Sequence, residues 1–177
     1  MKKLSVATLL IFSLVAFSAR PALAQSQAPT NDLENRIVKT LFSLPHYGVF
    51  DNLYFETSGS DVTLMGQALF EITKAEAAKR VSRIPGIGKV TNKIEVLPPL
   101  PSDDALRMNI YRSIFGAPDL HRYSMGADPT IHIIVKGGHV TLEGLVSTAE
   151  DRQRAEMVAK SLPGIFSFKN NLRVEKK

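Results

Sequence analysis

The side chains of this sequence best suited to metal binding or acid–base chemistry are its histidines, His46, His121, His132 and His139. His132 and Glu143 would face each other if the two apolar segments around Gly137-Gly138 formed a β-hairpin. An imidazole next to a carboxylate is common in zinc sites and in proton transfer. This pair is therefore the first candidate for chemistry in the chain.

The strand spacing argues against such a site. His139 lies four residues further along the expected hairpin, roughly 13 Å away at about 3.4 Å per residue. Two ligands do not complete a metal site. We therefore predict that no metal is bound, and we interpret His132 and Glu143 as a solvated surface pair on the side away from the helices.

Other catalytic patterns are missing from the sequence. His46 and His121 have no partner at motif spacing, and no hydrolase, metalloprotease, phosphate-loop or calcium-loop motif is present. We predict a protein that is not an enzyme, with no catalytic residue, no cofactor and no small-molecule substrate.

An internal repeat gives the strongest signal for domain organisation. Val62-Thr-Leu-Met-Gly66 returns 78 positions later as Val140-Thr-Leu-Glu-Gly144. Counted from Val62 and Val140, the two copies align without a gap for 35 residues, ten of which are identical. Each copy includes Pro-Gly-Ile, at 85–87 and 163–165. One small domain is therefore written twice.

Each copy is expected to fold as helix–strand–strand–helix–strand. The first helices should open at Asp32 and at Asp103 or Asp104, with the apolar stripes Leu33, Ile37, Leu41 and Leu44 in one copy and Leu106, Ile110 and Ile114 in the other. Alternating apolar residues on both sides of Gly137-Gly138 are typical of a hairpin.

The second helix of the second copy is expected to run from Ser147, with Glu150 completing a capping box, to Leu162. Asn92 and Asn170 lie on the inward side of the last strands, and we predict that they bind nearby backbone groups. The predicted core of the second copy consists of Ile133, Val135, Val140, Leu142, Val158 and Leu162.

The repeated pattern resembles the BON domain of bacterial envelope proteins. The residues that carry the resemblance are the two Val-Thr-Leu-x-Gly segments, the two Pro-Gly-Ile segments and the closing strands 92–96 and 170–174. The resemblance implies an α+β fold of two tandem BON domains, each α-β-β-α-β, with a three-stranded mixed sheet covered by two helices on one face. It also implies association with membranes or phospholipids rather than catalysis.

The N-terminus has the layout of a secretory signal peptide, residues 1–24, with a basic head, an apolar run and an Ala-Leu-Ala exit. Residues 25–30 are expected to form a disordered leader, 31–97 the first domain, 98–101 a proline-rich linker and 102–177 the second domain. The chain has no cysteine, which excludes a lipoprotein. The predicted location is the periplasm, and the arrangement is similar to the family of the osmotically inducible periplasmic protein Y.

Charge sets limits on the partner. Removing Lys2, Lys3 and Arg20 with the leader lowers the formal net charge from +5 to +2, which is 19 basic against 17 acidic residues. No charge run typical of a nucleic-acid binder is present, so nucleic acid is not expected as a partner. The expected partners are anionic phospholipid or a membrane surface, with envelope proteins as the alternative.

The candidate binding surface is the outer side of the first helix of the second copy, together with the loop after it. Residues at i, i+3 and i+7 form a second apolar stripe there. The loop between Phe115 and Ile131 is five residues longer than its counterpart and adds apolar and basic residues. The predicted lipid- or partner-binding residues are Met108, Tyr111, Arg112, Phe115, Leu120, Arg122 and Tyr123.

The sequence leaves the role of this stripe open, because the stripe would equally suit packing against the other repeat. The first repeat is expected to support the site without contacting the ligand. Three functions remain in view: a module that binds phospholipid and supports envelope integrity or stress tolerance, a protein-assembly module, and a chaperone-like factor.

Overall fold

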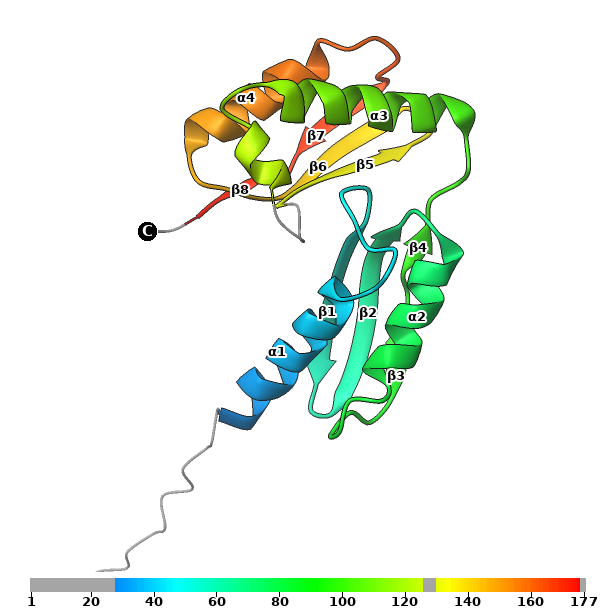
Figure 1. The fold of residues 1–177 in the computed structure, drawn as a ribbon. Coiled ribbons are helices and arrows are strands. Elements are labelled where there is room, and N and C mark those ends of the chain that lie inside the picture. Colours follow the sequence, from blue (N-terminus) through cyan, green and yellow to red (C-terminus); the bar gives the residue numbers. More distant parts are fainter. Residues whose placement is uncertain (1–27, 126–129, 176–177) are drawn as a thin grey trace, which may run out of the picture.

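The computed structural model describes residues 28–125 and 130–175. The predicted signal peptide, 1–24, lies outside the described residues, as do residues 25–27 of the predicted leader. Two units with the same order of elements follow one another, each with two helices on one face of a small sheet (Figure 1). The α+β class and the tandem arrangement are confirmed.

The first unit contains α1 (Ala28–Phe42), β1 (Asn52–Ser58), β2 (Asp61–Ala68), α2 (Glu71–Val81), β3 (Val90–Asn92) and β4 (Glu95–Val96). The second contains α3 (Pro101–Gly116), the 3-10 turn η1 (His121–Ser124), β5 (Ile131–Lys136), β6 (His139–Val146), α4 (Ala149–Lys160), β7 (Ser167–Asn170) and β8 (Arg173–Val174).

Each sheet is mixed, as predicted, and its last strand is interrupted. β1 pairs antiparallel with β2, and β3 and then β4 lie parallel to β2. β5 to β8 repeat this pattern. The two hairpins share one register, so Phe55 opposite Leu64 corresponds to Ile133 opposite Leu142. This correspondence allows the two units to be compared residue by residue.

Two asparagines cause the interruption. The Asn92 side chain donates to the carbonyl oxygen of Lys74 at 2.9 Å and accepts from the Ile94 amide at 3.1 Å. Asn170 contacts the carbonyl of Arg152 and the amide of Leu172 in the same way, both at 3.1 Å. The predicted structural role of both asparagines is confirmed, because each ties the end of a strand to the helix above it.

The cores lie between the helices and the sheets. Ile133, Val135, Val140 and Leu142 are buried together, and Leu162 packs against them. The prediction is wrong for Val158, which is half-buried and lies outside this cluster. The contacting face of α4 is set by Ala155 and Ala159, whose small side chains are fully buried. Val158 is one residue, roughly 100°, around the helix from Ala159.

Helix starts differ from the predictions. α1 begins at Ala28, so residues 28–30 belong to a helix and not to a disordered leader. α4 begins at Ala149, and its N-cap is Thr148, whose side chain accepts from the Asp151 amide at 3.0 Å. The predicted capping pair of Ser147 and Glu150 was therefore one residue too early.

Asp103 has a different role from the predicted helix start. α3 begins at Pro101, and the carboxylate of Asp103 accepts from the amides of Gly137 and Gly138 at 2.6 and 2.9 Å. Both glycines have positive φ, 59° and 75°, as a two-residue hairpin turn of this kind requires. A buried carboxylate thus holds the tip of the hairpin against the first turn of α3.

The equivalent residues Leu64 and Leu142 provide a test of the two cores, since both are fully buried. Replacing either one with alanine is expected to lower the free energy of unfolding by about 2–5 kcal/mol, through lost burial and a residual cavity. Urea unfolding measures this loss. Leu100→Ala, at an exposed position, is the control. Losses below about 1 kcal/mol at both core positions would contradict the shared core.

Candidate functional site

The structure does not keep the predicted binding residues together on one exposed surface. Phe115, Leu120 and Tyr123 are 5%, 0% and 7% exposed and belong to the core of the second unit. The prediction that they form an outer surface is wrong, because the extra residues after α3 fold back as η1 and cover the core. Met108 and Arg112 remain exposed.

Arg122 and Tyr123 form a polar network with Asp151 at the start of α4. The Asp151 carboxylate accepts from Arg122 at 2.5 Å, from the Tyr123 hydroxyl at 2.8 Å and from the Thr148 hydroxyl at 2.7 Å. Tyr123 also accepts from the Ser147 amide at 2.8 Å. The network fixes the longer loop to α4, so Arg122 has a structural partner already.

Tyr111 contacts the other repeat. Its ring lies 6.2 Å from that of Phe50 and 4.9 Å from that of Phe115, in edge-to-face geometry. Phe50 belongs to the loop between α1 and β1, residues 43–51, which reaches across to the second unit (Figure 1). The alternative interpretation of the stripe, packing between the repeats, therefore holds for Tyr111.

The same loop covers His132. The imidazole is 8% exposed, with Nδ1 3.3 Å from the carbonyl oxygen of Gly48 and Nε2 3.5 Å from the Tyr47 hydroxyl. His132 does face Glu143 across the hairpin, as predicted. The interpretation as a solvated pair is wrong, because it took no account of a loop from the other unit.

The crossing loop, residues 43–51, also pairs with the outer edge of β5. The Ile133 amide donates to the Val49 carbonyl oxygen at 2.7 Å, which is a strand-like contact between the units. Asp51 closes the loop by accepting from the amides of Gly48 and Leu69 at 2.8 and 2.7 Å. Asp51 is 2% exposed, and burial raises its pKa, against the opposing effect of these two hydrogen bonds.

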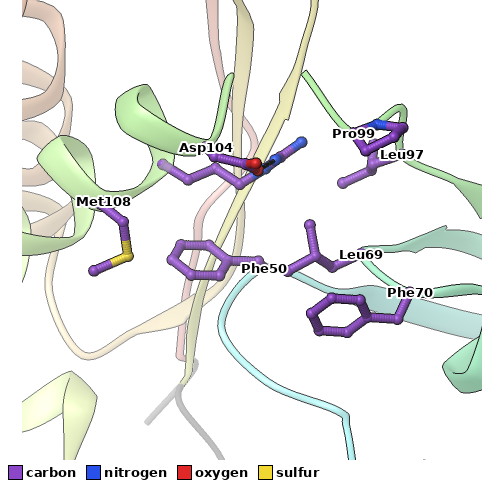
Figure 2. A pocket seen from close by; sticks show the side chains of 8 residues that line it. Phe50, Leu69, Phe70, Leu97, Pro99, Asp104 and Met108 are labelled. Carbon is purple, nitrogen blue, oxygen red and sulfur yellow. Dashed lines mark hydrogen bonds and ion pairs between the residues drawn. The ribbon is translucent and has the colours of Figure 1, made fainter. Parts of the chain in front are cut away.

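An open pocket of about 350 Å³ lies where the crossing loop, the linker and α3 meet. Figure 2 shows Phe50 projecting between Met108 on one side and Leu69 and Phe70 on the other. Leu97 at the end of the first unit and Pro99 of the linker complete its apolar wall. Two of its lining residues, Phe70 and Met108, are 51% and 39% exposed. We call this the junction pocket.

Charged groups line one side of the junction pocket. Arg107 is 1% exposed and donates to Asp104 at 2.5 Å and to the carbonyl oxygen of Val135 at 2.6 Å. These bonds use its two terminal nitrogens, and its buried Nε has no hydrogen-bond partner among the described residues. Arg112 follows Met108 by four residues and therefore lies on the same side of α3. Its side chain is exposed. The junction pocket thus combines an apolar surface with a nearby cation.

The sequence indicated that Met108 and Arg112 are exposed, and it gave no sign of Phe50, Leu69 and Phe70 in this pocket. These three residues belong to the first repeat, which was expected to give support without contact. Their role depends on a loop that crosses between units, and no periodicity along the chain signals such a crossing. Within residues 28–125 and 130–175, no group of three or more acidic, histidine or cysteine side chains is placed to hold a metal ion.

Comparison with known proteins identifies the repeated unit. The family model described as BON domain matches residues 51–98 and 102–176. The first match starts after α1, whereas the second includes α3. A search of curated proteins gave no match.

Two solved structures are similar to the chain at 13% identity. One is titled as the C-terminal domain of CdsD, the structural protein of the type III secretion system of Chlamydia trachomatis. It is matched over 82% of this chain and 98% of that one, with a TM-score of 0.29. The other, also CdsD, is matched over 82% and 94%, with a TM-score of 0.30. Scores this low support no statement about function.

Asp151 and Asp51 should change stability with pH in opposite directions. Burial acts to raise the pKa of Asp151, but hydrogen bonds from Thr148 and Tyr123 and the charge of Arg122 outweigh it and lower the pKa. Asp151 therefore stabilises the fold above about pH 4 and loses that contribution as the pH falls through its lowered pKa. The raised pKa of Asp51 gives a contribution that is present at low pH and lost as the pH rises.

The measurement is urea unfolding of Asp151→Asn, Asp51→Asn and the parent at about pH 5 and about pH 3. The stability advantage of the parent over Asp151→Asn is expected to shrink at the lower pH, and its advantage over Asp51→Asn to grow. If the stability advantage of the parent changed in the same direction for both variants, the hydrogen-bond networks assigned to Asp151 and Asp51 would be contradicted.

Proposed function

Because the chain belongs to the BON domain family, with two copies of the domain, we propose that it is a non-catalytic periplasmic protein that binds the surface of phospholipid membranes. BON domains are associated with membrane or phospholipid binding. The observation that carries the proposal for this chain is the junction pocket, an open apolar surface, with the exposed Arg112 about one turn of α3 beyond Met108. The proposed binding is peripheral. In the described part of the chain, no helix is long and apolar enough to cross a membrane.

The apolar part of the contact comes from both repeats. Phe70 of the first repeat and Met108 of the second line the junction pocket and are partly exposed. Full burial of a large apolar side chain contributes about 1.5–3 kcal/mol, so these half-exposed groups each add less. An apolar surface with a polar surrounding is typical of a membrane or protein contact site. The pocket volume is at the lower end of the range for sites that hold small ligands.

The electrostatic contribution to the proposed membrane binding is small. Arg112 lies beside the apolar groups, and a basic residue near an anionic surface contributes about 1 kcal/mol. The net charge expected after removal of the leader, +2, adds little attraction over distance. Binding should therefore be weak, reversible and sensitive to salt, and it should depend on the anionic lipid content of the membrane.

The role proposed for this binding is support of the cell envelope, including under stress. It rests on the predicted signal peptide, on the absence of cysteine and on the family. A protein exported without a lipid anchor reaches membranes by a surface such as the junction pocket. The two units are joined by more than their linker, because the crossing loop pairs with β5 and Lys136 forms an ion pair with Glu95. The junction therefore presents residues of both units together.

Sedimentation with phospholipid vesicles tests the proposal. The parent is expected to bind anionic vesicles more tightly than neutral ones. Arg112→Glu should weaken binding by at least about fivefold, the equivalent of about 1 kcal/mol, and Met108→Glu should weaken it on vesicles of either charge. Both positions are exposed, so the variants are expected to fold.

Met157→Glu is the matched control, because Met157 is 60% exposed on α4 and does not line the junction pocket. Arg122 is unsuitable for this test, since its loss would leave Asp151 without its ion-pair partner. A parent protein that binds no vesicles, or pocket variants that bind as well as the parent, would refute the proposal.

A further inference from the structure

The first unit has an open groove between α1 and β1. It has a volume of about 200 Å³ and is lined by Val38, Leu41, Phe42, Leu53, Tyr54 and Phe55. All six side chains are apolar or aromatic. We call it the β1-edge groove, because β1 is the outer strand of its sheet. It lies apart from the junction pocket and shares none of its lining residues.

The equivalent position in the second unit lies between α3 and β5, and the crossing loop covers it. Helix positions correspond at an offset of 73 and hairpin positions at 78. Tyr111 thus matches Val38, His132 matches Tyr54, and Ile133 matches Phe55. The crossing loop packs Phe50 on Tyr111 and Tyr47 on His132, with ring centroids 6.2 and 5.6 Å apart.

Exposure shows the difference between the two edges. Tyr54 is 50% exposed, whereas its counterpart His132 is 8% exposed. Phe42 is 40% exposed, whereas its counterpart Phe115 is 5% exposed. The first unit therefore presents a partly exposed aromatic surface at a place where the second unit carries an extended segment of polypeptide. Phe42 contacts the crossing loop through the ring of Tyr47, at 5.4 Å between centroids.

Backbone groups make the same distinction. The Ile133 amide on the outer edge of β5 donates to Val49. Phe55 has the equivalent register, opposite Leu64, so its amide also points away from the neighbouring strand. Across the described residues, no backbone hydrogen bond joins the outer edge of β1 to another segment. Open strand edges of this kind bind extended peptides.

We propose that the β1-edge groove binds an extended segment of a partner protein that carries two adjacent apolar residues like Val49 and Phe50. The aromatic side chain lies against Val38 on α1, and the carbonyl oxygen before it accepts from the Phe55 amide. The occupant is polypeptide rather than lipid because the edge of β1 offers amides at strand spacing, which repeated peptide carbonyls match. The crossing loop makes the same two contacts with the second unit, a backbone hydrogen bond from Ile133 to Val49 and a ring contact between Phe50 and Tyr111.

The probe is a synthetic peptide with the sequence of residues 45–52, added to the isotope-labelled protein and followed by NMR. Signals from Val38, Phe42 and Phe55 are expected to shift, and exchange of the Phe55 amide with solvent to slow. Val38→Glu should weaken binding by about tenfold or more, because it places a charge in an apolar contact. Phe42→Gln is a second variant at an exposed position of the groove.

Controls separate this site from others. A peptide with aspartate in place of Val49 and Phe50 should not bind, and Met157→Glu protein should bind the original peptide as the parent does. No binding at millimolar peptide, binding unchanged by both groove variants, or shifts confined to Tyr111 and His132 would each overturn the proposal. Self-association of the protein that Val38→Glu abolishes would identify a second copy as the occupant and would also overturn it.

Discussion

The arrangement of the two repeats depends on the crossing loop, which is anchored by the hydrogen bond from the Ile133 amide to the Val49 carbonyl oxygen. This bond brings the loop along the outer edge of β5, and Phe50 and Tyr47 then cover Tyr111 and His132. Asp51 makes this possible by closing the loop from within. Without the crossing loop, the linker and the exposed Lys136–Glu95 ion pair would be left to join two small domains with little core each.

The crossing loop makes two nearly identical units different. The edge of the second unit is covered and its long loop is tied to α4 through Asp151, so that unit is closed on this side. The β1 edge of the first unit stays open. Leu69 and Phe70, which follow β2 in the first unit, lie with Met108 at the junction pocket. Duplication thus produces two kinds of surface, one at the junction and one at the free edge.

The fold could be predicted from the sequence because it depends on local and repeated signals. Alternation around Gly137-Gly138, the Pro-Gly helix ends and the asparagines of the last strands each indicated the structure that was found. The candidate site could be predicted only in part. Met108 and Arg112 are exposed as expected, but Phe115, Leu120 and Tyr123 are buried. A helical stripe shows that a face is apolar, and it does not show which segment covers that face.

Native-state hydrogen exchange of two amides tests the crossing loop most directly. Ile133 and Phe55 have equivalent positions on the outer strands of the two sheets, so an isolated repeat would give them similar exchange rates. We expect the Ile133 amide to exchange slowly, because it donates to Val49, and the Phe55 amide to exchange rapidly. Equally rapid exchange of both amides, in a protein whose core amides are protected, would contradict the assigned hydrogen bond.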